Sequence, residues 1–411
     1  MMLSRVNNIL LYIILWVVYN LQELLHIQGV IGQLLLFFLL AHGFWSWIWV
    51  NTNIKKGPYI KIVNIVLLLN TIYGVLLILS GEKHIIDSSE IIDVSNINYL
   101  KAYYVSLLPI YSFYYLNIIS NDAEKRLNYI VAIFVVGTML MFYQNFNVTS
   151  ILLGKEEITN NMGYYFLPLI PLSLYVVNVN KIVKLILFLV IMIFIIASLK
   201  RGAILISIVL AILCAYRIFK VLPRKYIIFF MLFLMMLLLV SYHYLLDFYD
   251  SSDLFQRRLE GTMEGNSGGR DENYTLYLLY FLYKTPILNF IFGYGADGTL
   301  AIFRYYAHND WLEIAINMGL LGLIVYFLYW TSFYFQIKST KNELLRWCLS
   351  DIWFIYFLAS FFSMSIVAMP TAAAFCIAYC LSTEYKKIRI CLYKRGHGQQ
   401  ILSENQTQMK Q

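Results

Sequence analysis

The sequence predicts an all-α, polytopic integral membrane protein with about twelve transmembrane helices, and two observations support that prediction. First, 60% of the 411 residues are hydrophobic and only 13% are charged, whereas a soluble domain has roughly a quarter charged residues. Second, apolar runs of about 17–25 residues recur along the chain, and each can cross a hydrocarbon layer of ~30 Å as a helix. The composition therefore excludes a soluble enzyme. The net charge of +8 does not indicate a nucleic-acid binder, because the cations lie in short loops between apolar runs.

The predicted spans are separated mostly by short connections. They cover Ile9–Leu25, Val30–Val50, Ile62–Ser80, Tyr99–Ile119, Tyr129–Phe146, Tyr164–Val179, Ile182–Ser198, Ala203–Phe219, Tyr226–Leu246, Trp311–Phe335, Trp347–Val367 and Thr371–Ser382. The sixth span contains Pro168 and Pro171, which we expect to bend it. The first has only Arg5 before it and no small-residue cleavage site after it, so we interpret it as a retained span.

The distribution of Lys and Arg predicts the orientation of the chain. Placing both termini in the cytoplasm puts 21 of the 31 Lys and Arg residues on the cytoplasmic side. The connection from Asp247 to Asp310, about sixty residues long, then lies outside, and loops of that length are usually functional. Its aromatic stretch, Tyr274 to Tyr283, is expected to form an interfacial helix. We therefore predict a transmembrane domain over residues 1–395, with its large outer loop at 247–310, and a polar cytoplasmic tail over 396–411.

Several residue patterns that would indicate a metal or cofactor site do not occur in the sequence. There is no Asp-x-Asp pair, no P-loop and no second histidine near His308. The cysteines have no metal-ligand spacing and fall within spans or on the cytoplasmic side, which predicts reduced thiols. They are Cys214, Cys348, Cys376, Cys380 and Cys391. We therefore expect chemistry that uses no metal and no cofactor.

The first candidate functional group is Arg201, preceded by Lys200, in the sequence Ser-Leu-Lys-Arg-Gly-Ala that starts at Ser198. It lies between two apolar runs with almost no loop, so the chain must turn tightly and present these cations at the outer face. A charge in that position is expensive unless it faces a cavity or the membrane interface. A functional cation and a snorkelling turn residue are both consistent with the position.

Two further candidates lie in and after the long outer segment. The first is Arg270, followed by Gly293 and Gly295, whose lack of a side chain permits close backbone approach or simply a turn. The second is His308, at the start of the tenth span, with Glu313 after it. A histidine with its ordinary pKa near ~6.5 is suited to general base catalysis at neutral pH, although a histidine at a membrane surface is also often merely interfacial.

Asn309 and Asp310 follow His308 directly, and either can cap the helix of the tenth span.

Together these sites resemble the O-antigen ligase and O-antigen polymerase superfamily of bacterial membrane glycosyltransferases. The resemblance covers roughly residues 182–330, and the first six spans are similar only in hydropathy. The residues that carry it are Ser198-Leu199-Lys200-Arg201-Gly202-Ala203, Gly269-Arg270, Pro286, Gly293-Tyr294-Gly295, Ala307-His308-Asn309-Asp310-Trp311-Leu312-Glu313 and Gly319-Leu320-Leu321-Gly322.

The resemblance implies a transferase in the bacterial inner membrane, with its active site facing the periplasm. A glycan carried on undecaprenyl diphosphate is the donor, and a sugar hydroxyl attacks its anomeric carbon. Arg201 and Arg270 would stabilise the diphosphate, for which a bidentate guanidinium is suited, and His308 would take the hydroxyl proton. The remaining implied substrate-binding residues are Lys200, Asn309, Glu313, Gly293 and Gly295. Membrane lipid and a chain-length regulator protein are the implied partners.

Ligase and polymerase differ in the acceptor, which is the lipid A core for the ligase and a second lipid-linked repeat unit for the polymerase. The composition rich in Tyr, Ile and Asn resembles that of divergent surface-polysaccharide polymerases, which favours polymerase. A flippase for the lipid-linked repeat unit is the alternative from a different class. It would need charged residues within many spans and no large outer domain, so the long outer segment disfavours it.

Overall fold

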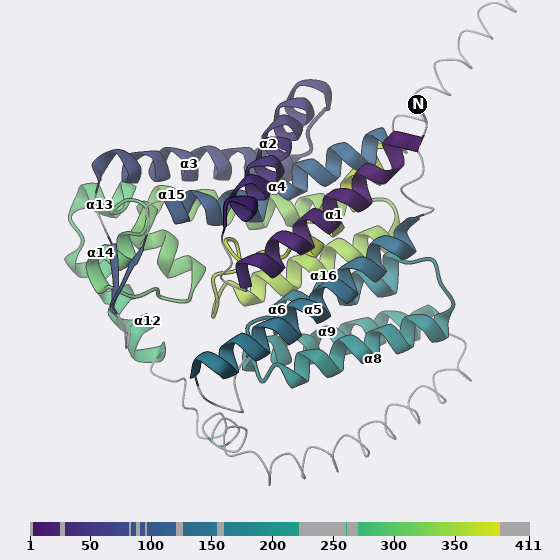
Figure 1. The fold of residues 1–411 in the computed structure, drawn as a ribbon. Helices are drawn as coiled ribbons and strands as arrows, with labels where there is room; N and C mark the ends of the chain where they lie inside the picture. Colours follow the sequence, from purple (N-terminus) through teal and green to yellow (C-terminus); the bar gives the residue numbers. More distant parts are fainter. Residues whose placement is uncertain are drawn as a thin grey trace, which may run out of the picture.

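The computed structural model describes residues 3–24, 29–81, 84–87, 91–94, 97–120, 126–153, 160–221, 260 and 270–386 (Figure 1). Within these residues the chain is mainly helical, as the apolar runs predict. The long helices are α1 (Leu3–Leu24), α2 (Val30–Asn53), α3 (Pro58–Ser80), α4 (Ile97–Ile119), α5 (Leu127–Leu153), α8 (Lys181–Ala197), α9 (Arg201–Val221), α15 (Asp310–Ser339), α16 (Glu343–Ala359) and a last helix over residues 371–386. The short ones are α6 (Gly163–Phe166), α7 (Leu169–Pro171), η2 (Leu172–Val176), α12 (Arg270–Leu279), η3 (Tyr280–Lys284), α13 (Ile287–Phe292) and α14 (Gly298–Phe303).

Four helices of the described chain are long and apolar enough, by length and composition, to cross a membrane. They are Val30–Asn53, Pro58–Ser80, Leu127–Val148 and Asp310–Ser339. Large apolar side chains such as Phe37, Phe38 and Leu79 stay more than half exposed on the outer faces, as a bilayer permits and water does not. The protein is therefore a helical membrane protein. The number of crossings and their orientation remain predictions.

Helices lie over every predicted span except Tyr226–Leu246, which falls outside the described residues together with the 396–411 tail. The predicted sixth span is broken into α6, α7 and η2, because Pro168 and Pro171 interrupt the regular helical hydrogen bonds. The predicted eleventh span is too long at its end: α16 stops at Ala359, and residues 360–370 form turns instead. That turn segment packs beside the start of α15.

The all-α prediction missed one element, an antiparallel hairpin of β1 (His84–Asp87) and β2 (Ile91–Val94). Its register pairs His84 with Val94 and Asp87 with Ile91. Isoleucines in both strands favour extended backbone because their β-branched side chains fit a pleated surface. The hairpin lies between α3 and α4 in the sequence and packs beside α14.

Neighbouring long helices form the bundle that holds the site. α2 packs on α4, α3 lies along α15, and α1 lies along α5 (Figure 1). Fully buried aromatic side chains, among them Trp16, Tyr111, Phe113 and Phe375, fill the interior. Figure 1 shows α12, α13, α14 and the hairpin gathered at one end of this bundle.

The described part of the long connection after α9 is folded onto the protein. Its aromatic stretch is helical, as predicted, and forms α12 and η3. Tyr277 and Phe281 bury their rings against Ala315 and Ile316 of α15. The opposite face exposes large apolar groups such as Tyr283, which is consistent with an interfacial position; that position remains a prediction.

Helix α15 is broken at Gly319, whose backbone angles of φ 63° and ψ −155° are open to glycine but strained for other residues. The break removes the helical partners of the Ile316 and Asn317 carbonyls. The N–H groups of Tyr294 and Gly295 donate to these carbonyls at 2.9 Å each. The break divides α15 into a short first half and a long second half.

Candidate functional site

His308 lies in the connection between α14 and α15, at the end of the bundle where α12 to α14 gather. Its side chain is exposed and its backbone has φ 53°, a left-handed conformation that is uncommon outside glycine. The Tyr274 hydroxyl of α12 donates to the His308 carbonyl at 3.2 Å. This contact fixes the His308 turn against α12, the helix that begins at Arg270.

Asn309 positions the residues around His308 with both ends of its side chain. Its Oδ1 accepts from the N–H groups of Trp311 and Leu312 at 3.0 and 3.2 Å, so it is the N-cap of α15, as the sequence predicts. Its Nδ2 donates to the Phe361 carbonyl at 2.8 Å. The same amide therefore ties the start of α15 to the turn segment after α16.

Arg201 is the first residue of α9, immediately after the tight turn that the sequence predicts. The turn occupies residues 198–200 and includes Leu199 at φ 52°. Arg201 itself is exposed. At Gly202 an added Cβ would lie 2.1 Å from the Tyr164 hydroxyl oxygen and 2.7 Å from Phe362 Cε2, so the α9 start packs directly on the turn segment after α16.

The predicted site segments therefore share one supporting element. The turn at residues 360–362 contacts the α9 start through Phe362 and the His308 turn through Phe361. Arg270 is the first residue of α12, and α12 contacts the His308 turn through the Tyr274 hydroxyl. The Arg270 side chain lies outside the described residues. The structure thus brings together the backbones that carry Arg201, Arg270 and His308. That their functional groups share one cavity remains a prediction.

A cleft opens beside these turns, between α4 and the first half of α15. Its empty space, mouth included, is about 510 Å³. Three carboxylates line it, those of Asp297, Asp310 and Glu313, and its described lining contains no Lys, Arg or His. Arg201 and His308 are therefore not among the lining residues of this cleft.

Two of these carboxylates are bound within the protein. Glu313 accepts from the Thr299 hydroxyl at 2.6 Å and from the Ala307 N–H at 2.5 Å, so it holds the connection that carries His308. Asp310 accepts from the Tyr326 hydroxyl at 2.7 Å and from the N–H and hydroxyl of Ser365 at 3.1 and 2.5 Å.

The third carboxylate, Asp297, differs from the other two. Its residue is only 5% exposed and its φ of 54° is left-handed. Within the part of the chain that the structure describes, its side chain has no hydrogen-bond donor, and it does not cap α14. Burial raises the pKa of the Asp297 carboxyl to about 6. Burial also raises the pKa of the Tyr306 hydroxyl, and the negative charge of Asp297 raises it further.

The substrate-binding role expected of Gly293 and Gly295 does not fit their backbone geometry. The Gly293 N–H donates to Asn289 and the Gly295 N–H to Asn317, so neither is available to a phosphate. A Cβ on Gly293 would lie 2.2 Å from the Asn317 carbonyl oxygen. These glycines allow α13 to approach the break in α15, and thereby shape the wall of the cleft.

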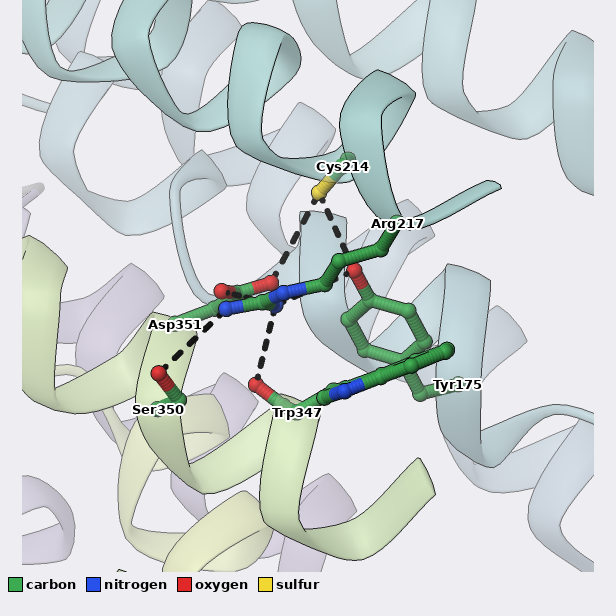
Figure 2. A network of polar contacts seen from close by, with 6 residues as sticks. All are labelled: Tyr175, Cys214, Arg217, Trp347, Ser350 and Asp351. Carbon is green, nitrogen blue, oxygen red and sulfur yellow. Dashed lines mark hydrogen bonds and ion pairs between the residues drawn. The ribbon is translucent and has the colours of Figure 1, made fainter. Parts of the chain in front are cut away.

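A second polar cluster lies away from this end, between α9 and α16 (Figure 2). The Arg217 guanidinium pairs with the fully buried Asp351 carboxylate and reaches the Tyr175 hydroxyl at 3.3 Å. Arg217 is a residue of α9, and its ion pair with Asp351 lies inside the bundle. Its donors are satisfied by protein groups, so the cluster has a structural role.

The structure describes four of the five cysteines and most of the residues that could bind a metal. Cys214, Cys348, Cys376 and Cys380 are free and buried, and Cys391 lies outside the described residues. Among the residues that can be described, no group of three or more His, Cys, Asp or Glu is placed to hold a metal ion.

Residues 185–327 match a family model described as O-antigen ligase. Over this segment the chain is similar to the O-antigen ligase family. The segment includes the Arg201 turn, α12 to α14 and the His308 turn, so the resemblance on which these residues were chosen is confirmed. The family implies a glycosyltransferase-like enzyme with a lipid-linked glycan substrate. A comparison with curated proteins gave no match.

The sequence does not identify Asp297 as a site residue, nor the turns at residues 360–370 as an element that supports the site. Asp297 follows Gly295-Ala296, a pattern that indicates only a turn. The turns were assigned to a span because Phe361, Phe362 and Ile366 are apolar. Nothing local in the sequence indicates that Asp310 binds this segment.

Proposed function

We propose that the protein is a surface-polysaccharide polymerase that joins undecaprenyl-diphosphate-linked repeat units at the periplasmic face of the bacterial inner membrane. The observation that carries the proposal is the O-antigen ligase match over residues 185–327, because its segment contains the Arg201, Arg270 and His308 positions at one end of the bundle. A chain-length regulator is the protein partner that we propose.

In the proposed reaction, a sugar hydroxyl of one repeat unit attacks the anomeric carbon of another. A new C–O bond forms while the bond from the anomeric carbon to the diphosphate oxygen breaks, and undecaprenyl diphosphate leaves with the electron pair. Arg201 and Arg270 stabilise the charge that grows on the diphosphate, with Lys200 beside them. His308 accepts the proton of the attacking hydroxyl. The exposed positions of Arg201 and His308 leave both accessible to substrate.

The proposed mechanism uses no divalent metal, because the guanidinium groups supply the cationic charge that a metal would otherwise provide. This proposal is tested by running glycan transfer in EDTA. Activity in EDTA supports it, and activity lost in EDTA and restored by magnesium or manganese contradicts it.

O-antigen ligase is the second candidate, favoured by the description of the matching family model. Its chemical step is the same, but the acceptor is the lipid A core. The two candidates therefore differ in what must be added to the purified protein before a product forms.

The deciding experiment supplies purified protein in nanodiscs with lipid-linked repeat units alone, and then with lipid A core added. A ladder of lipid-linked chains from repeat units alone supports polymerase. Product that forms only after lipid A core is added supports ligase and contradicts polymerase. The absence of product in both reactions contradicts the transferase proposal, provided that an active wild-type extract elongates the same substrate.

A further inference from the structure

The Asp297 cleft is separate from the cationic residues that the proposed function assigns to the diphosphate. It lies between α4 and the first half of α15, and its empty space, with the open mouth included, is about 510 Å³. Tyr99 and Tyr103 of α4 and Tyr306 line it with aromatic rings. Such a lining is apolar with a few polar groups, which is the usual composition of a ligand site.

The acidic groups of the cleft are unequal in what they can offer a ligand. Asp310 and Glu313 already accept hydrogen bonds from protein groups. Asp297 is only 5% exposed, and no group within the described chain donates a hydrogen bond to its carboxylate. A largely buried carboxylate without protein donors is costly, because it has lost much of its water and gained no hydrogen bond in exchange. Its left-handed backbone adds strain of the kind that accumulates at ligand sites.

The chemistry of the lining selects among ligands. An ionised carboxylate only accepts hydrogen bonds, so its partners are donors such as hydroxyl groups. A diphosphate is disfavoured because it is an anion, and the described lining contains no cation to hold it. A metal ion is disfavoured because the described residues place no metal-binding group of three acidic or His/Cys ligands here.

We propose that this cleft binds the acceptor sugar, with the Asp297 carboxylate accepting hydrogen bonds from its hydroxyl groups. The inference rests on the proposed function and adds separate binding sites for the two substrates. The donor diphosphate binds at Arg201 and Arg270, and the acceptor glycan binds in the Asp297 cleft. His308 directly follows Ala307, whose N–H donates to Glu313 at the cleft wall, and in this account the reacting hydroxyl of the acceptor extends from the cleft toward His308. Asp297 is in this account a substrate-binding residue.

The test measures binding by thermal unfolding of the full-length protein in nanodiscs. The probes are the free repeat-unit oligosaccharide, released from its lipid by mild acid, and undecaprenyl diphosphate. Asp297→Asn keeps the shape of the side chain and tolerates the left-handed backbone. Glu272→Gln is the matched control, because it removes one carboxylate from the exposed surface of α12.

We expect Asp297→Asn to need about 10- to 100-fold more oligosaccharide for half-saturation, the range that follows from losing a hydrogen bond to a charged group. Its response to undecaprenyl diphosphate and that of Glu272→Gln to both probes should equal the wild-type response. Wild-type oligosaccharide binding by Asp297→Asn overturns the inference. So does magnesium or calcium chloride alone, if it stabilises the wild-type protein but not Asp297→Asn.

Failure of the underlying function has a different signature. A wild-type protein that binds neither probe and elongates no lipid-linked repeat unit overturns the proposed function and this inference together. A wild-type protein that elongates repeat units and binds undecaprenyl diphosphate, while Asp297→Asn retains full oligosaccharide affinity, overturns only the acceptor site.

Discussion

Replacing Glu313 by alanine removes the acceptor that holds the connection carrying His308. The Thr299 hydroxyl and the Ala307 N–H both donate to the Glu313 carboxylate, and both residues are almost completely buried. Each buried donor left without an acceptor costs about 1–3 kcal/mol, so the two together cost about 2–6 kcal/mol. Glu313→Gln keeps one amide oxygen as acceptor and should lose roughly half as much.

The same change should affect activity, because the connection that Glu313 holds contains two strained residues, Arg304 at φ 63° and His308 at φ 53°. Without the carboxylate these residues are free to relax, and His308 moves away from its substrate. The assay combines thermal unfolding in nanodiscs, hydrogen exchange at residues 304–308 and glycan elongation. The expected order of stability and activity is wild type, Glu313→Gln, Glu313→Ala.

Glu272→Ala, on the exposed surface of α12, is the control for the loss of a carboxylate and should match the wild type. The reasoning would be refuted if Glu313→Ala showed the same stability, hydrogen exchange and glycan elongation as the wild type. The hydrogen bonds of Glu313 would then not be needed to hold the connection that carries His308.

Three further results are expected. Gly319→Ala should destabilise the protein by several kcal/mol in denaturation, because its Cβ would lie 2.6 Å from the Gly293 nitrogen and its φ is positive; Gly29→Ala, which meets no atom within 4 Å, should have little effect. Arg217→Ala should lower the free energy of unfolding by about 3–5 kcal/mol by leaving Asp351 buried and unpaired, and the double replacement by Met and Leu should recover most of it. The Asp297 carboxyl has its pKa raised from 3.8 to about 6, so the folded state holds a proton that the unfolded state releases; wild-type stability should fall by about 2 kcal/mol between pH 4 and 6 relative to Asp297→Asn, and equal loss in both proteins would contradict this.

The elements that sequence reasoning predicted are those determined by local chemistry. A bilayer leaves the backbone few alternatives to a helix, so the apolar runs predict helices such as α2 and α3 well. The tight turn before Arg201 and the Asn309 cap are likewise local, since each depends on residues within a few positions in the chain. Arg201, Arg270 and His308 could be identified through the family resemblance, because the order of their motifs along the chain is visible in the sequence.

The features that were missed depend on partners distant in the sequence. Asp310 accepts from Ser365, 55 residues away, so neither the end of α16 nor the turns after it follow from hydropathy. The break at Gly319 is stabilised by the N–H groups of Tyr294 and Gly295, just after α13, which donate to the carbonyls of Ile316 and Asn317. Asp297 acquires its properties from burial between α15 and α4, and α4 lies far from it in the chain.

The central claim is that Arg201, Arg270 and His308 form one transferase site. It is tested most directly by the long-chain glycan made by cells that lack the wild-type gene and express His308→Ala or Arg270→Lys, with membrane abundance checked by blotting. We expect long chains to be lost at normal abundance, with elongation by His308→Ala reduced about 10²–10⁴-fold because the general base is gone. Arg270→Lys should also fail, because lysine keeps the charge without the planar fork. Normal long chains from both variants at normal abundance would contradict the claim.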